Sequence, residues 1–149
     1  MIEVEVKVDT SRFDRMLADF PVRMAQAQQR ALWYIGQAVS SRAQQAFRTS
    51  SLRPSAWAPR KDKKSKHPLL IRSGNLRQSI AWRFNGDDTV VVGSPAKYAR
   101  YHQFGTKRMP ARPFFPFDER GQLTPGMKSK IDKNVARIFK EEMGKLGGG

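Results

Sequence analysis

Cysteine is absent from this chain of 149 residues, and only two histidines occur in it. The missing cysteines exclude disulfide bonds and thiolate metal ligands, and two histidines form a zinc site only with help from carboxylates. No run approaches the ~18 consecutive apolar residues that a membrane helix needs. The first residues also lack the basic and apolar regions of a signal peptide. We therefore expect a soluble protein, made in the cytosol and without membrane contact.

Sequence patterns of catalysis are missing as well. The chain has no glycine-rich phosphate loop, no recognisable serine nucleophile motif and no His-Glu-x-x-His helix. His102 lies in an aromatic-rich segment and His67 precedes a proline in a basic one, so packing or surface roles suit both better than catalysis. We predict a protein that is not an enzyme and uses no cofactor. A small hydrolase, for which the sequence offers no site, is the weakest alternative.

Acidic residues are few relative to basic ones. The chain has 28 Lys and Arg against 13 Asp and Glu, a net charge of +15. The first twenty residues hold five acids against three bases, whereas Arg53 to Arg72 holds seven bases and one acid. Such a balance indicates a polyanion or acidic proteins as partners, and unlike surfaces also allow head-to-tail self-association. The alternative is that the basic side chains only solvate loops.

Periodicity predicts the main elements of an α+β fold. Residues 2–8 alternate apolar and charged side chains, the period of a strand with one buried face. Residues 80–84 and 90–92 flank Asn85-Gly86, a turn typical of a β-hairpin. Pro21 suits the first turn of a long helix that runs to about Thr49, and Thr124-Pro125 begins a second amphipathic helix. The predicted core consists of Leu32, Ile35, Val39, Ile80, Trp82, Val90, Val92, Ile131, Val135 and Ile138.

Two shorter helices complete the predicted fold. Residues 96–104 form one of them, and it ends at Gly105, where a left-handed residue is needed. The other follows Thr10 or Ser11 as its cap, and its inward residues are expected to be Phe13, Met16, Leu17 and Phe20. We predict a single domain over residues 1–149 in which a small antiparallel sheet packs on long amphipathic helices, with a flexible tail at residues 147–149.

A basic segment from about Ser50 to Pro68 interrupts these patterns. It is rich in serine, proline and lysine, and Trp57 is its one aromatic residue. Low apolar content and high charge do not offset the entropy of ordering, so we predict a long mobile loop that becomes ordered on a partner. Trp57 then packs either on its own domain, which is the commoner case, or on that partner.

The stretch from Tyr98 to Phe117 combines many aromatic rings with three prolines and several bases. Each proline fixes φ and removes a backbone donor, which favours a shaped, extended segment after Gly105. Arg112 stands between Ala111 and Pro113, a frame that aims its guanidinium at a carboxylate or a backbone carbonyl. We predict that this segment either serves assembly or anchors the fold.

Several motifs together resemble the tailed-phage virion morphogenesis family. They are Arg53 to Pro59 (RPSAWAP), Leu70 to Ile80 (LIRSGNLRQSI), Val92-Gly93-Ser94, Tyr98-Ala99, His102 to Thr106 (HQFGT) and Met109 to Phe114 (MPARPF). The resemblance covers roughly Leu52 to Phe117. It implies a structural, non-enzymatic tail-completion protein that acts where the tail meets the head, in the style of ring-forming tail terminators.

The predicted function is therefore that of a ring subunit in the virion neck, assembled in the host cytoplasm. Its expected partners are copies of itself, tail-tube and head-neck connector proteins, and genomic DNA in the channel. The alternative is a free nucleic-acid-binding module that grips single strands by charge and stacking. The residues expected to contact partners are Trp57, Pro59, Arg60, Lys61, Lys63, Lys64, Lys66, Tyr98, His102, Phe104, Arg112 and Phe114.

Overall fold

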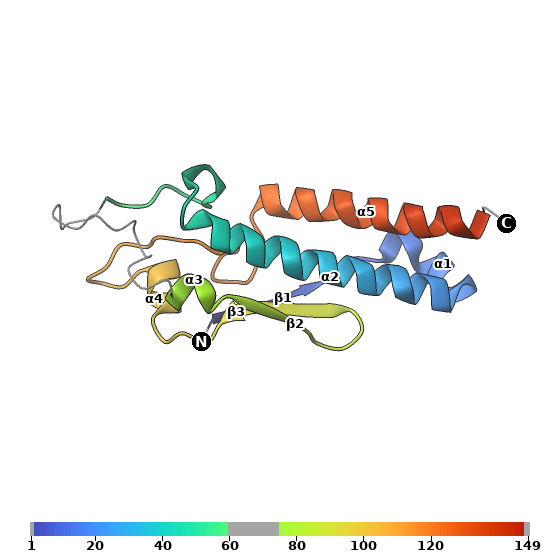
Figure 1. Cartoon of the computed structure of the whole chain (residues 1–149), viewed down its shortest axis with the longest axis horizontal. Helices are drawn as coiled ribbons and strands as arrows, with labels where there is room; N and C mark the ends of the chain where they lie inside the picture. The colour runs from blue at the N-terminus through green and yellow to red at the C-terminus, as the bar shows by residue number, and fades with distance from the viewer. Residues whose placement is uncertain (1, 60–74, 148–149) are drawn as a thin grey trace.

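The computed structural model describes residues 2–59 and 75–147, with side chains to residue 145. The described part is elongated, and its two long helices run along the long axis (Figure 1). Its elements in chain order are β1 (Ile2–Lys7), η1 (Ser11–Phe13), α1 (Asp14–Asp19), α2 (Pro21–Ala46), η2 (Ser50–Leu52), α3 (Asn75–Gln78), β2 (Ala81–Phe84), β3 (Thr89–Ser94), α4 (Ala99–Phe104) and α5 (Pro125–Gly147). The predicted α+β class is confirmed.

The sheet is antiparallel, with the strand order β1-β3-β2. Val92 of the central strand lies opposite Val4 on one side and Trp82 on the other, so the apolar positions of all three strands share one face. Helix α2 packs on β3 and β2. Every residue of β3 is buried, whereas β1 alternates buried and exposed residues, as the sequence predicts. The Asn-Gly hairpin is also present, and Gly86 has a φ of 74°.

The long helix α2 is the element on which the rest packs. Pro21 occupies its first turn, as predicted, and the helix ends at Ala46, three residues before the predicted Thr49. Its buried stripe follows helical spacing and faces both α5 and the sheet. Gly36 lies in that stripe, directly against the indole of Trp82, and a Cβ at this position would collide with the ring. Glycine therefore lets α2 approach β2 closely.

Most of the predicted core is confirmed, with two differences. Eight of the ten residues belong to the main core, whereas Trp82 is only partly buried against it. Ile138 is buried but lies outside the main core, where it lines a shallow pocket beside Tyr34. The prediction that Phe20 points inward is wrong: this residue lies at the junction of α1 and α2, where the chain leaves helical geometry, and its ring is exposed.

Candidate interaction surfaces

The stretch from Tyr98 to Phe117 folds back on itself around Gln103. The side chain of Gln103 is buried in α4. Its Oε1 accepts the backbone N–H groups of Phe114 (3.0 Å) and Phe115 (2.9 Å), and its Nε2 donates to the carbonyls of Phe115 (3.0 Å) and Phe117 (3.3 Å). Gly105 ends the helix with a φ of 77°, as predicted. Sequence reasoning missed Gln103, although an amide between aromatic neighbours was a usable signal.

Phe114 and Trp57 belong to the core rather than to a partner surface. Phe114 has no exposed surface and packs on Phe47 and Phe115. Trp57 is 9% exposed, donates its indole N–H to the carbonyl of Pro113 (2.7 Å) and meets the ring of Phe47 edge-on. The prediction that these two side chains contact partners is wrong, because their own domain already buries them. For Trp57, the alternative of packing on its own domain is the correct one.

Residues 50–59 also differ from the predicted mobile loop. Three arginines hold this segment in place through backbone carbonyls. Arg42 donates to Leu52, Arg53 donates to Ala46 and stacks over the ring of Trp57, and Arg112 donates to Ala58 (3.0 Å) and Pro59 (3.1 Å). Charge-assisted bonds to carbonyls supply the ordering energy that composition alone did not reveal. The remaining predicted loop residues, Arg60, Lys61, Lys63, Lys64 and Lys66, lie outside the described residues.

Arg112 thus takes the second of its two predicted partners, a backbone carbonyl, and it acts within the chain. Pro59 is exposed and contributes its carbonyl to this contact. His102 is partly buried. This burial is the main cause that lowers the pKa of its imidazole, and the nearby positive charge of Arg112 lowers the pKa further. Tyr98 meets His102 edge-on and is itself exposed, whereas Phe104 is partly buried beneath Arg100. Of the rings among these predicted contact residues, Tyr98 is exposed, whereas His102 and Phe104 are partly buried.

The described residues at one end of the long axis include many bases and no acid. We call it the acid-free end and define it as residues 42–59, 75–80 and 95–117, which include η2, α3 and α4 (Figure 1). None of these residues is Asp or Glu. Two tyrosines, Tyr98 and Tyr101, are also exposed there. The nine bases of this end are Arg42, Arg48, Arg53, Arg77, Lys97, Arg100, Lys107, Arg108 and Arg112.

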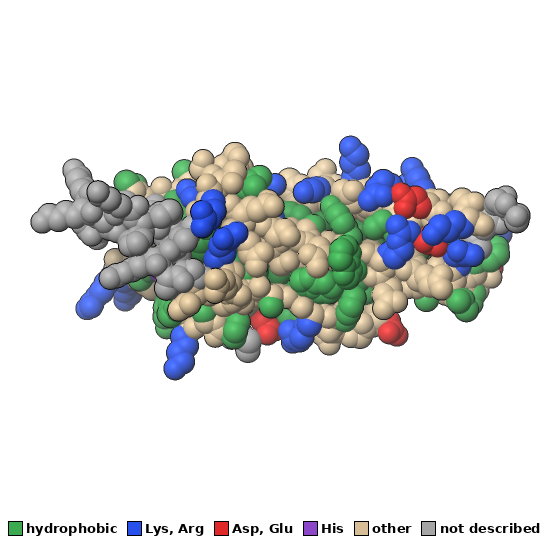
Figure 2. Space-filling view, viewed as in Figure 1, with side chains coloured by type: hydrophobic (Ala, Val, Ile, Leu, Met, Phe, Trp, Pro, Cys, Tyr) green, Lys and Arg blue, Asp and Glu red, His purple; other side chains and the backbone are tan. Residues whose placement is uncertain are grey.

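A second surface lies along the side of the molecule, on α2. This helix contains no acid, and its exposed residues Val22, Gln26, Gln29, Trp33 and Gln37 follow one another at helical spacing. We call this stripe, together with Phe84 of β2, the α2 surface. The side chain of Trp33 is 54% exposed and that of Phe84 is 43% exposed. Figure 2 shows hydrophobic side chains gathered in the middle of this face.

A shallow pocket of about 590 Å³ opens on the α2 surface. Its basic rim is neutralised within the chain, because Arg30 pairs with Glu141 and Glu142, and Arg137 pairs with Glu141. The hydroxyl of Tyr34 is buried there, has no hydrogen-bond partner in the described part of the chain, and burial raises its pKa. The pocket is lined by Gln26, Gln29, Arg30, Trp33, Tyr34, Phe84, Arg137 and Ile138.

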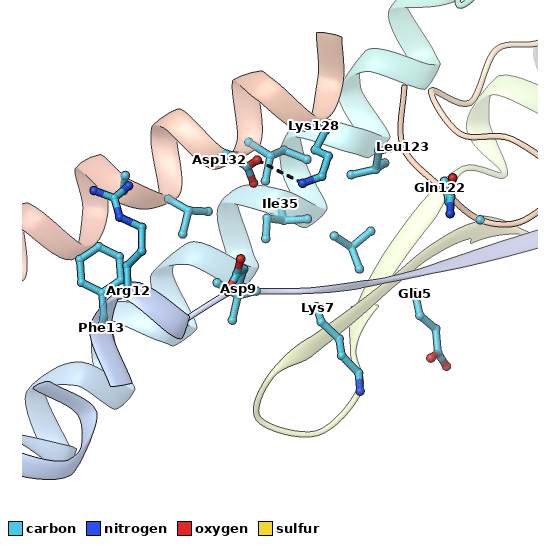
Figure 3. A pocket seen from close by; sticks show the side chains of 16 residues that line it. Glu5, Lys7, Asp9, Arg12, Phe13, Ile35, Gln122, Leu123, Lys128 and Asp132 are labelled. Carbon is cyan, nitrogen blue, oxygen red and sulfur yellow. Dashed lines mark hydrogen bonds and ion pairs between the residues drawn. The ribbon is translucent and has the colours of Figure 1, made fainter. Parts of the chain in front are cut away.

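A further cavity of about 630 Å³ lies between β1 and the first half of α5. Figure 3 shows Ile35 and Leu123 in its wall, while Glu5 and Lys7 point away from α5. Lys128 and Asp132 form an ion pair at its rim (3.4 Å). Asp9 accepts the backbone N–H of Ser11, and this bond lowers the pKa of its carboxyl. These groups do not converge on one point, so the cavity offers no arrangement of acid, base and nucleophile.

The described residues contain neither a metal-binding group nor a helix that could span a membrane. No group of His, Asp or Glu side chains in residues 2–59 and 75–147 could hold a metal ion. Within the same ranges, every helix is too short or too polar to cross a membrane.

Exposed aromatic side chains such as those of the α2 surface are enriched at protein interfaces. The chain belongs to the phage virion morphogenesis family, whose family model matches residues 8–139. It is also similar to the Mu-like prophage FluMu G protein 1 of Haemophilus influenzae, with 31% identity over 74 residues; this match spans 49% of each chain. No solved structure gives a significant match. The protein thus has a structural role in the phage virion.

Proposed function

We propose that the protein completes the tail of a tailed phage or prophage particle and joins it to the head, as one subunit of a ring at the neck. Family membership supports the virion role. The observation that carries the finer proposal is the separation of two unlike surfaces, because the α2 surface lies along the side of the subunit and the acid-free end lies at its tip. Subunits standing side by side bring their tips together.

The α2 surface is the contact between neighbouring subunits in this proposal. Copies of a chain with a net charge of +15 repel one another, so they approach most easily where positive charge is compensated within the chain, as it is for Arg30 and Arg137 on this surface. Protein interfaces are rich in aromatic residues, and Trp33 and Phe84 are both exposed on this surface. A contact that passes from this surface to a different face of the next subunit closes into a ring when the rotation between neighbours returns to the start, and otherwise forms an open filament.

Trp33→Glu tests the proposed contact. A charge in the middle of an apolar interface should prevent ring formation, and a prophage that carries only this variant should produce tails that do not join heads. Ser129→Glu is the matched control, since it adds the same charge at an exposed position of α5, outside both surfaces. Electron microscopy of the lysates shows the outcome. Normal joining with Trp33→Glu would rule the contact out.

A free nucleic-acid-binding protein is the second candidate, and the acid-free end favours it. The two functions differ in location, because a tail-completion protein remains in the finished particle and a free binding module does not. Mass spectrometry of purified particles distinguishes them. Presence of the protein in a stoichiometric amount in the particles supports the structural role, and its absence from them supports the binding module.

A further inference from the structure

We propose that the acid-free end binds the phosphate backbone of duplex DNA without reading its sequence. Five of its nine bases are exposed and come from three separate segments. Arg48 follows α2. Lys97 lies just before α4 and Arg100 lies within it, while Lys107 and Arg108 lie in the loop after α4. Figure 2 shows several Lys and Arg side chains at this end of the described part.

No salt bridge among the described residues involves this end. Elsewhere several bases are paired: Arg30 and Arg137 share Glu141, and Lys128 pairs with Asp132. The less exposed arginines of the acid-free end, Arg42, Arg53 and Arg112, bond to backbone carbonyls instead. A carbonyl accepts the hydrogen bond and leaves the positive charge uncompensated. The tip is therefore held together by arginines without losing its positive potential.

A surface that carries only positive charge fits a partner whose charge is uniformly negative. Duplex DNA is such a partner, since it carries one negative charge per about 1.7 Å of helix axis. A protein partner fits less well, because interface cores are depleted in charged residues, lysine among them. The exposed residues Tyr98 and Tyr101 add hydroxyl groups that can donate to phosphate oxygens. Phosphate contacts position a protein on DNA and carry no sequence information.

The identity of this DNA as the packaged genome rests on the proposed function, whereas the binding itself does not. In a ring of side-by-side subunits, the acid-free ends lie together and face the passing duplex. Binding to DNA can be measured on the free protein, and joining of tails to heads can be measured on particles. Failure of one measurement therefore leaves the other proposal standing.

The test compares two variants with equal loss of charge. The test variant carries Lys97→Gln, Arg100→Gln, Lys107→Gln and Arg108→Gln, and the control carries Arg15→Gln, Lys130→Gln, Lys133→Gln and Lys140→Gln at positions exposed elsewhere. Fluorescence anisotropy with two labelled duplexes of unrelated sequence gives the affinity between 50 and 200 mM NaCl. Circular dichroism confirms that both variants are folded.

Four phosphate contacts give a slope of log K against log [salt] of about −3.6, so this range of salt lowers the affinity roughly 150-fold. We expect the wild type and the control to show at least this slope, equally for both duplexes, and the test variant to have a slope smaller by about 3.6. Equal loss of binding in both variants would overturn the proposal, since net charge alone would then explain it. Displacement of the duplex by polyglutamate as efficiently as by unlabelled DNA, at equal charge concentration, would also overturn it and indicate an acidic protein partner.

Discussion

Gln103 pairs its side-chain amide with both backbone groups of Phe115. The Oε1 atom accepts the N–H of Phe115 at 2.9 Å, and Nε2 donates to its carbonyl at 3.0 Å. One side chain thereby supplies the hydrogen bonds that a neighbouring strand would otherwise make to the backbone of the buried, proline-rich segment after α4. Because Phe115 stacks on Phe114 and Phe117, the bond fixes an aromatic cluster as well as a loop.

The first prediction concerns this bond. Gln103→Leu should lower the free energy of unfolding by about 2–4 kcal/mol, because it leaves buried N–H and C=O groups without partners. Urea denaturation followed by circular dichroism measures the change. Gln45→Leu, at an exposed position of α2, is the control and should change stability by less than about 0.5 kcal/mol. A stability equal to the wild type in Gln103→Leu would contradict the role given to this amide.

A second prediction follows from the close approach of α2 to β2. Gly36→Ala should destabilise the fold by about 1–3 kcal/mol, since its Cβ would collide with the indole of Trp82. The same substitution in a Trp82→Ala background should cost less, because the ring is gone. Gly126→Ala on α5 is the matched control: its Cβ meets open space, and the change should be neutral or stabilising. Equal costs of Gly36→Ala in both backgrounds would exclude this packing.

A crossed pair of tryptophan substitutions separates the core from the proposed surface. Trp57→Ala should cost about 3–5 kcal/mol of stability, because it removes a buried ring and the bond to Pro113. Trp33→Ala should leave the melting temperature nearly unchanged, because its ring is largely exposed, yet it should reduce incorporation into particles. Thermal denaturation and immunoblots of purified particles give both readouts. The reverse pattern would show that the two residues have been assigned the wrong roles.

A fourth prediction concerns pH. Glu142 is buried on α5, and the hydrogen bond from Lys145 (3.0 Å), with a further one from Arg30 (2.7 Å), holds the pKa of its carboxyl below the ordinary value of 4.5. A lowered pKa in the folded state means that the stability from these pairs is complete above pH 4.5 and is lost as the pH falls through the folded-state pKa.

Glu142→Gln should therefore lower stability at pH 7 and flatten the loss of stability below about pH 4.5. Glu119→Gln is the control, because Glu119 is exposed and forms no salt bridge within the described residues. Urea titrations between pH 3 and pH 7 measure both profiles. An acid-induced loss as steep in Glu142→Gln as in the wild type would place the titrating group elsewhere.

Local signals in the sequence predicted most of the fold. Positive φ at Gly86 and Gly105, and proline in the first turn of α2, follow from backbone sterics that act within a few residues. Apolar periodicity likewise identified the faces of β1 and α2, because burial selects one face of each. These features depend on neighbours in the chain, so one sequence is enough to find them.

Long-range contacts were less predictable. Trp57 lies in a charged, proline-rich segment whose composition favours disorder, yet it packs against Pro113 and Phe47. Ile138 has helical spacing typical of the core but faces the pocket on the α2 surface, because its side of α5 turns away from the sheet. The α2 surface was missed altogether, since Trp33 and Phe84 are far apart in the sequence and meet only in the fold.

Electron cryomicroscopy of the purified particle tests the central claim most directly. The account predicts density for this fold in a closed ring where the tail meets the head, with the α2 surface of each subunit against its neighbour. A ring at this place in which Trp33 faces solvent would contradict the proposed contact. Absence of the fold from a complete reconstruction of the neck and tail would contradict the proposed function itself.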